Sequence, residues 1–192
     1  MNRTKADHLP APLNDLFLLA MMLTLAAILT AAMVLQYYGG EIPCPLCLLQ
    51  RVAMFGVCFG VILHFRNGYS ARNAGFSMLF AFFLLIVSVR QTLLDIYPRP
   101  GHGYIGSTVL GLHMPVWSVL IAAAILLAFA INLAVLDDER LRDPHPSPIL
   151  SRLAWLLSLY VIAICLINFA SVIVQCGAGA CHTTEYKMLS GS

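Results

Sequence analysis

The chain has 192 residues, of which 60% are hydrophobic and only 10% are charged. A soluble domain needs about 25% charged residues to cover its surface, so this composition excludes an ordinary soluble protein and favours a surface that faces lipid. The formal net charge of +2 is small, and the sequence has no acidic or basic tail and no pattern typical of nucleic-acid binding.

Five apolar runs follow one another along the chain. A helix needs about 20 residues to cross roughly 30 Å of hydrocarbon, where it must satisfy its own backbone hydrogen bonds. The second and third runs are short, but milder residues extend them back to Pro45 and forward to Leu94. We therefore expect an all-α integral membrane protein with five transmembrane helices. The runs are Leu16–Tyr37, Leu48–Leu63, Ala74–Val89, Val116–Leu136 and Leu153–Val174.

These runs divide the chain into four expected segments. The first run, at about 22 residues, is longer than the apolar region of a cleaved signal peptide, so we expect it to be retained as a helix. The segments are an N-terminal arm (1–13), a four-helix membrane core (14–136), a linker (137–152), and a fifth helix with its tail (153–192).

Lysine and arginine are concentrated in alternate connections between the runs. The N-terminal arm, the connection 64–73 and the linker 137–152 carry most of them, whereas the connections 38–44 and 95–115 and the C-terminal tail are poor in them. Short loops that are rich in Lys and Arg stay in the cytoplasm. We therefore expect a cytoplasmic N-terminus and, after five crossings, a C-terminus on the outer side.

Four of the six cysteines fall at the outer ends of the expected helices, where disulfides persist. Cys44 and Cys47 precede the second helix, and Cys176 and Cys181 follow the fifth. The other two lie within helices, where a cysteine usually packs as a small apolar side chain, and we expect no chemical role for them. They are Cys58 and Cys165.

The stretch Cys44-Pro45-Leu46-Cys47 is the most informative part of the sequence. Its two cysteines can close a short disulfide that gains little closure entropy, which suits electron transfer better than structural bracing. The start of a helix favours a thiolate. Arg51 follows one turn after Cys47, and an arginine in a membrane helix costs about 2.5–3.5 kcal/mol. We expect it to face an anion or a quinone carbonyl, with extension to the lipid headgroups as the alternative.

Two motifs make the chain resemble the DsbB family of disulfide-forming membrane proteins. Pro-Cys-x-x-Cys-x-x-x-Arg, entering the second helix, matches at Cys44, Cys47 and Arg51. The segment Gly111-Leu112-His113-Met114-Pro115-Val116-Trp117, at the start of the fourth helix, is similar to the family's Gly-Leu-x-Met-Pro-x-Trp. The resemblance implies a four-helix bundle in a bacterial inner membrane. It also implies a quinone, ubiquinone or menaquinone, near the second cysteine and the arginine, and a periplasmic dithiol partner like DsbA.

The chain departs from the family in the place of its second cysteine pair. The family's pair lies between helices three and four, whereas residues 95–115 here contain no cysteine. We expect Cys176 and Cys181 to act as the relay that meets the partner and then exchanges with the first pair at Cys44, the cysteine nearer the loop, while Cys47 faces the quinone. A static bridge that caps the fifth helix and a metal site that includes His182 are the alternatives.

Other polar residues within the helices give weaker indications. His113 and Met114 lie in the second motif, so we expect them near the quinone, although His113 also suits a membrane interface. Gln50 and Asn168 are expected to hydrogen-bond between helices. The leading hypothesis is electron transfer from a protein dithiol to a quinone, with Cys44, Cys47, Arg51, Cys176 and Cys181 as its catalytic residues. The alternative is a membrane metal-binding or redox-sensing protein that uses the same thiols without turnover.

Overall fold

Five long helices make up nearly all of the structure, a computed structural model that describes residues 10–68, 70–96, 108–135 and 148–177. Each helix has 22 residues or more and is apolar enough to cross a membrane. The expectation of an all-α membrane protein with five spans is therefore confirmed. The helices are α1 (Pro10–Tyr38), α2 (Pro45–Asn67), α3 (Ala71–Ile96), α4 (Met114–Val135) and α6 (Pro148–Cys176), and a short hairpin, β1 (Thr108–Val109) with β2 (Leu112–His113), precedes α4.

The helices extend beyond the apolar runs because their polar residues point into the bundle. α2 begins at Pro45, where proline suits the first turn, and ends before Gly68, whose φ is 82°. It contains the buried side chains of Gln50 and Arg51. α3 likewise continues past the third run to Ile96 and buries Gln91. A polar side chain in a membrane helix is least costly where other helices supply its partners.

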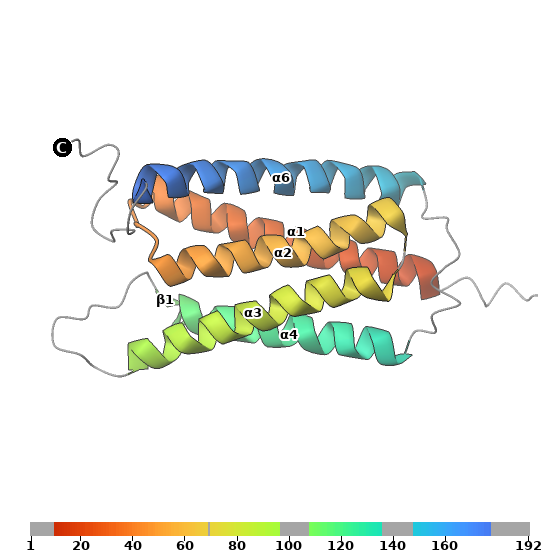
Figure 1. The fold of residues 1–192 in the computed structure, drawn as a ribbon, viewed down its shortest axis with the longest axis horizontal. Helices are drawn as coiled ribbons and strands as arrows, with labels where there is room; N and C mark the ends of the chain where they lie inside the picture. The colour runs from red at the N-terminus through yellow and green to blue at the C-terminus, as the bar shows by residue number, and fades with distance from the viewer. Residues whose placement is uncertain (1–9, 69, 97–107, 136–147, 178–192) are drawn as a thin grey trace, which may run out of the picture.

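The first four long helices form a bundle, and α6 lies beside it against α1 and α2 (Figure 1). α2 packs on α3, and α3 packs on α4. α4 also reaches α1, where the amide of Asn132 donates to Asn14 at 2.8 Å and the Phe17 and Phe129 rings meet edge to face. This arrangement confirms the expected four-helix bundle with a fifth helix added to it.

Glycines allow α2 and α3 to approach closely. A Cβ atom on Gly60 would lie 2.2 Å from Ser77 Oγ and 2.8 Å from the backbone oxygen of Asn73. A Cβ atom on Gly56 would lie 2.2 Å from the ring of Phe80. Small residues four apart on a membrane helix let two backbones pack together. The resulting α2–α3 contact determines how the polar residues of α2 meet those of α3.

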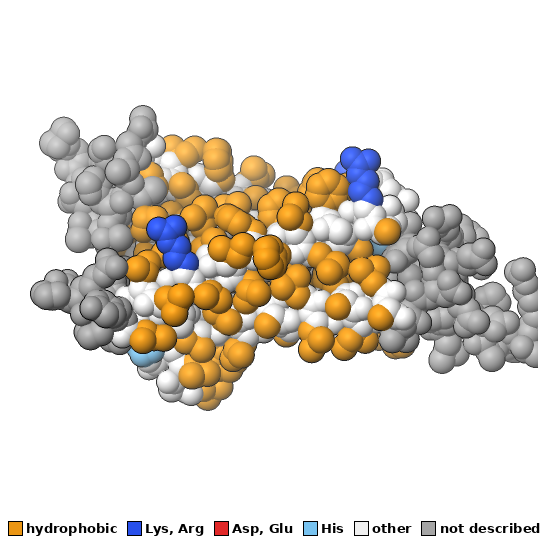
Figure 2. Space-filling view, turned by 60° about the horizontal axis from the view of Figure 1, so that its bottom comes forward, with side chains coloured by type: hydrophobic (Ala, Val, Ile, Leu, Met, Phe, Trp, Pro, Cys, Tyr) orange, Lys and Arg blue, Asp and Glu red, His pale blue; other side chains and the backbone are white. Residues whose placement is uncertain are grey.

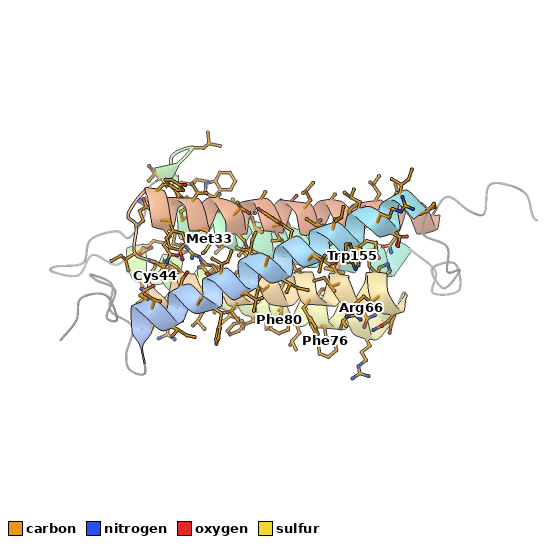
Figure 3. The ribbon with its side chains drawn as sticks, turned by 90° about the horizontal axis from the view of Figure 1, so that it is seen from above. Met33, Cys44, Arg66, Phe76, Phe80 and Trp155 are labelled. Atoms are coloured by element: carbon orange, nitrogen blue, oxygen red, sulfur yellow. A yellow bond between two sulfur atoms is a disulfide. The ribbon has the colours of Figure 1, made fainter. Side chains whose placement is uncertain are left out.

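The outside of the bundle suits lipid. Figure 2 shows one face covered with hydrophobic side chains, with basic side chains away from its middle. Figure 3 shows Cys44 towards one end of the bundle and Arg66 towards the other. Exposed arginines at the Arg66 end include Arg72 and Arg152, at the starts of α3 and α6. The end that carries Cys44 is therefore opposite to a basic end.

Candidate redox site

The two cysteines of the Cys-x-x-Cys stretch form a disulfide at the start of α2. Their Cα atoms are 5.1 Å apart. Cys44 is the N-cap of the helix: its Sγ accepts the backbone N–H of Cys47 at 3.1 Å, and its carbonyl accepts from Leu48. The N–H groups of a first helical turn have no partners within the helix and favour negative charge nearby. The sulfurs are thus already placed where a thiolate would be stabilised.

The two cysteine residues differ in exposure. Cys44 is 6% exposed, whereas Cys47 is only partly buried. From the sequence we expected Cys44, nearer the loop, to be the natural point of exchange with another dithiol. Cys47 is the more exposed residue of the two, so we expect attack on Cys44 to require movement of the loop before it.

A chain of side-chain hydrogen bonds links the disulfide to α3 and α4. The amide of Gln91 donates to Cys44 Sγ at 3.5 Å and to Cys47 Sγ at 3.4 Å. Its oxygen accepts from the amide of Gln50 at 3.0 Å, and the Gln50 oxygen accepts from the Ser118 hydroxyl at 3.3 Å. The disulfide therefore contacts the bundle interior through an amide, not only through apolar side chains.

Arg51 is buried on another side of α2, between α1 and α6. Its Nη1 donates to Gln36 Oε1 at 2.6 Å and to Asn168 Oδ1 at 3.1 Å, and it lies 3.4 Å from Met33 Sδ. Its Nη2 donates to the carbonyl of Ala32 at 3.1 Å. The guanidinium does not extend to the surface, and these contacts tie α6 to α1 and α2 one turn below Cys47.

α6 buries a stripe of residues at alternating spacings of three and four, as in a coiled coil. Its first half is apolar and its second half is polar, at the level of Arg51 and the disulfide. Gln175 donates to the carbonyl of Pro43 at 2.9 Å, and Ser171 hydrogen-bonds to Tyr37. The stripe consists of Ala154, Leu157, Val161, Ile164, Asn168, Ser171 and Gln175.

The end of α6 brings another cysteine to the same end of the bundle. Cys176 follows Gln175, is buried and is disulfide-bonded. The chain then turns at Gly177, with a φ of 57°, whose N–H donates to the carbonyl of Ile173. The other member of the expected pair, Cys181, and His182 of the alternative metal site lie outside the described residues. Cys58 and Cys165 are free thiols.

The remaining residues expected at the site lie at the start of α4. His113 is in β2, and Met114 is the first residue of α4. The Ser118 hydroxyl also reaches the carbonyl of Met114 at 3.3 Å, so this segment connects to the disulfide through the amide chain. Among the side chains that the structure describes, no three of His, Cys, Asp or Glu converge as a metal site.

Sequence reasoning missed three glutamines that the structure places at the site. Gln91, Gln36 and Gln175 contact, respectively, the disulfide, Arg51 and the loop before Cys44. Each is a polar residue within or at the end of an apolar run, and this interruption is the indication of a buried polar contact that the sequence offers. The expectation that Gln50 and Asn168 bond between helices is confirmed, the first to Gln91 and the second as an acceptor for Arg51.

Comparison with known proteins gives the same family as the motifs. Residues 14–102, which include all of α2 and α3 and nearly all of α1, match the family model "Disulfide bond formation protein DsbB". Disulfide bond formation protein B of Azoarcus sp. (strain BH72) is 36% identical over 96 residues, which are 47% of this chain and 56% of that protein. No solved structure matches.

The extent of these matches is limited. The chain spans little more than half the length of the curated relative that it matches, and α4 and α6 lie beyond the family model. Within the matched region are the disulfide, Arg51 and Gln91. Over residues 14–102, which are less than half of the chain, the sequence is similar to the DsbB family of disulfide bond formation proteins.

Proposed function

We propose that this protein is a membrane oxidoreductase that generates disulfides. It oxidises the dithiol of a periplasmic thioredoxin-fold partner like DsbA and passes the electrons to a membrane quinone, either ubiquinone or menaquinone. The site lies at the outer face of a bacterial inner membrane, with the N-terminus in the cytoplasm and the C-terminus in the periplasm. Cys44, Cys47, Arg51, Cys176 and Cys181 carry the reaction.

One observation carries this proposal: a disulfide caps the first turn of a membrane helix, where a buried amide contacts both sulfurs. A structural bridge over so short a loop adds little stability. The helix start and the amide instead favour the thiolates that appear when the bridge opens. The similarity of residues 14–102 to the DsbB family supports the same activity.

The reaction consists of two disulfide exchanges followed by electron transfer to the quinone. A thiolate of the partner attacks one sulfur, which forms a mixed disulfide and releases the other sulfur as a thiolate. The partner's second thiolate then attacks the mixed disulfide, so that the partner leaves oxidised and the tail pair of Cys176 and Cys181 is reduced. The same two steps between the two pairs then leave Cys44 and Cys47 reduced. Transfer of two electrons and two protons from the reduced Cys44 and Cys47 to the quinone re-forms their disulfide and yields a quinol.

The tail pair supports a relay in this scheme. Gln175 fixes the end of α6 to the loop before Cys44, so the bridge that includes Cys176 lies at the same end of the bundle as the first disulfide. We propose that the partner reduces Cys176 and Cys181 first and that this pair then reduces Cys44 and Cys47. The static-bridge alternative predicts that the partner attacks Cys47 or Cys44 directly.

The quinone is the electron-accepting substrate, and Arg51 and Cys47 are the residues best suited to receive it. A guanidinium keeps its charge and suits the negative charge that develops on quinone oxygens during reduction. The present acceptors of Arg51 include the neutral amide oxygens of Gln36 and Asn168. A quinone carbonyl oxygen is also a neutral acceptor and can take the place of either one. His113 and Met114, at the start of α4, are proposed to contact the ring.

Quinone reduction by the purified full-length protein tests this function. Reduced thioredoxin-fold dithiol protein is added with a soluble ubiquinone or menaquinone analogue, and both loss of quinone absorbance and loss of donor thiols are followed. The proposal requires one quinone reduced per dithiol oxidised and no reaction in a Cys44→Ser, Cys47→Ser double variant. If the wild-type thiols cycle with the donor but no quinone is consumed, the protein is a sensor and not this enzyme.

A further inference from the structure

The hydrogen bonds around the disulfide all run in one direction. The Ser118 hydroxyl shares its proton between Gln50 and the Met114 carbonyl, both at 3.3 Å. The Gln50 amide donates to Gln91, and the Gln91 amide donates to the sulfurs. Ser118, Gln50 and Gln91 come from α4, α2 and α3 respectively, and all three are buried. In such a chain each bond polarises the next, so the last donor is stronger than an isolated amide.

The last donor reaches both reacting atoms. Gln91 Nε2 lies 3.5 Å from Cys44 Sγ and 3.4 Å from Cys47 Sγ, so neither sulfur is favoured by distance. A sulfur in a disulfide is a weak acceptor, whereas a thiolate is a charged one, and hydrogen bonds to charged groups are roughly twice as strong as neutral ones. The chain therefore stabilises the reduced pair more than the oxidised pair.

The support of Gln91 fixes which of its two amide atoms faces the sulfurs. The Gln50 amide nitrogen donates to Gln91 Oε1, which leaves Gln91 Nε2 to face the disulfide. The opposite orientation of Gln91 would set two amide nitrogens against each other at the buried Gln50 contact, and unpaired buried donors are costly. The Gln50 contact thus maintains a donor at the disulfide.

We propose that Gln91 is a catalytic residue of the disulfide exchange, whose amide, polarised by Gln50 and Ser118, stabilises the thiolate released in each step. The proposal rests on the proposed function only for the direction of electron flow. When a partner thiolate attacks one sulfur, the S–S bond breaks and its electron pair stays on the other sulfur. Gln91 donates to that leaving sulfur, whichever of the two it is. The same bond raises the reduction potential of the pair, so electrons enter it more readily.

The reduction potential of the Cys44–Cys47 pair, measured without quinone or partner, tests this role. The full-length protein is equilibrated in dithiothreitol redox buffers, thiols are trapped by alkylation, and the peptide that contains both cysteines is quantified by mass spectrometry. Gln91→Met keeps nearly the same shape but lacks the donor. We expect its equilibrium to shift about tenfold towards the disulfide, which corresponds to a potential about 30 mV lower.

Two further variants give a graded series. Gln50→Met removes the support of Gln91 without touching its contact with sulfur, and Ser118→Ala removes only the first donor. The decrease in reduction potential should be largest in Gln91→Met, smaller in Gln50→Met and smallest in Ser118→Ala. If Gln91→Met does not fold, the Gln50→Met shift carries the test, with a several-fold change expected.

A matched control separates this role from helix packing. Ser77 is a buried residue of the same α2–α3 interface, and its hydroxyl donates to the carbonyl of Val57 at 3.0 Å. Ser77→Ala should destabilise the bundle and leave the potential unchanged. An unchanged potential in both Gln91→Met and Gln50→Met, or an equal shift in Ser77→Ala, overturns the proposal. Because quinone is absent from the assay, failure of the wild type to reduce quinone would affect only the proposed function.

Discussion

The side chain of Gln175, near the end of α6, donates to the backbone carbonyl of Pro43, the residue before Cys44, at 2.9 Å. This bond connects the fifth helix to the loop that carries the first cysteine of the redox pair. Gln175 is fully buried, so the bond is shielded from water. Together with the bonds of Asn168 to Arg51 and of Ser171 to Tyr37, it links the part of the chain that matches the DsbB family to the helix that lies beyond that match.

Gln175→Leu should loosen the end of α6 from this loop. A buried hydrogen bond contributes about 0.5–1.5 kcal/mol, and leaving the Pro43 carbonyl unsatisfied can cost about 1–3 kcal/mol. We expect faster alkylation of reduced Cys44, because the loop that buries it opens more often. Tyr160→Phe is the control, because it removes a hydroxyl of α6 that pairs with Thr30 of α1, away from the site. Equal effects of the two changes would mean that the Pro43 bond has no special role.

Arg51→Leu should weaken quinone use and leave the cysteine pair oxidisable. The change removes a cation and also deprives Gln36 and Asn168 of a buried donor, so some loss of stability accompanies it. We expect at least a tenfold rise in the apparent KM for quinone. Arg51→Lys should restore part of the affinity, because its charge is retained but its planar donor geometry is lost. An unchanged KM in Arg51→Leu would place the quinone elsewhere.

The helices of this protein could be predicted from composition, because lipid requires long apolar segments with saturated backbones. The polar contacts of the site could be predicted only in part. The position of Arg51, one helical turn after Cys47, could be predicted from the sequence alone. The rotation of α3 that brings Gln91 to the sulfurs, and the heptad stripe that sets Asn168 beside Arg51, depend on packing between helices. In the sequence these residues are only interruptions in apolar runs.

Gly60→Ala should destabilise the α2–α3 contact on which the Gln50–Gln91 bond depends. The added methyl group would lie 2.2 Å from Ser77 Oγ and 2.8 Å from a backbone oxygen, so the helices must separate. Overpacking of this kind costs about 1–3 kcal/mol. The measurement is the midpoint of unfolding in a detergent titration. Gly75→Ala on α3 is the matched control, because its added atom meets nothing within 4 Å, and it should not lower the midpoint.

A reporter fused after Ser192 should be active only on the periplasmic side. The prediction follows from the basic residues at the end of the bundle opposite to Cys44, together with five crossings. A paired reporter that is active only in the cytoplasm, fused after Asn67 at the end of α2, should give the complementary signal. Activity of the C-terminal reporter in the cytoplasm would exclude a relay by the tail cysteines, because the donor dithiol is periplasmic in the proposed scheme.

Electrons are expected to pass through the two cysteine pairs in a fixed order, from the tail pair to Cys44 and Cys47. Each exchange forms a mixed disulfide, which persists when the cysteine that would resolve it is absent. If the tail pair is the relay, Cys176→Ser or Cys181→Ser should trap a cross-link from the remaining tail cysteine to Cys44 or to the partner protein. The cross-link is visible on a non-reducing gel and is lost on reduction.

The burial of Cys44 makes this test more specific. Cys44 is 6% exposed, and its loop is bonded to Gln175, so a tail cysteine can attack it only when that loop opens. We therefore expect the trapped cross-link to Cys44 to increase when Gln175→Leu is added to the Cys181→Ser variant. Cys58→Ser, which removes a buried free thiol in α2, is the control and should not change the cross-link. If neither tail variant traps a species and donor turnover is intact, the bridge at Cys176 is structural, and the partner attacks the Cys44–Cys47 pair directly.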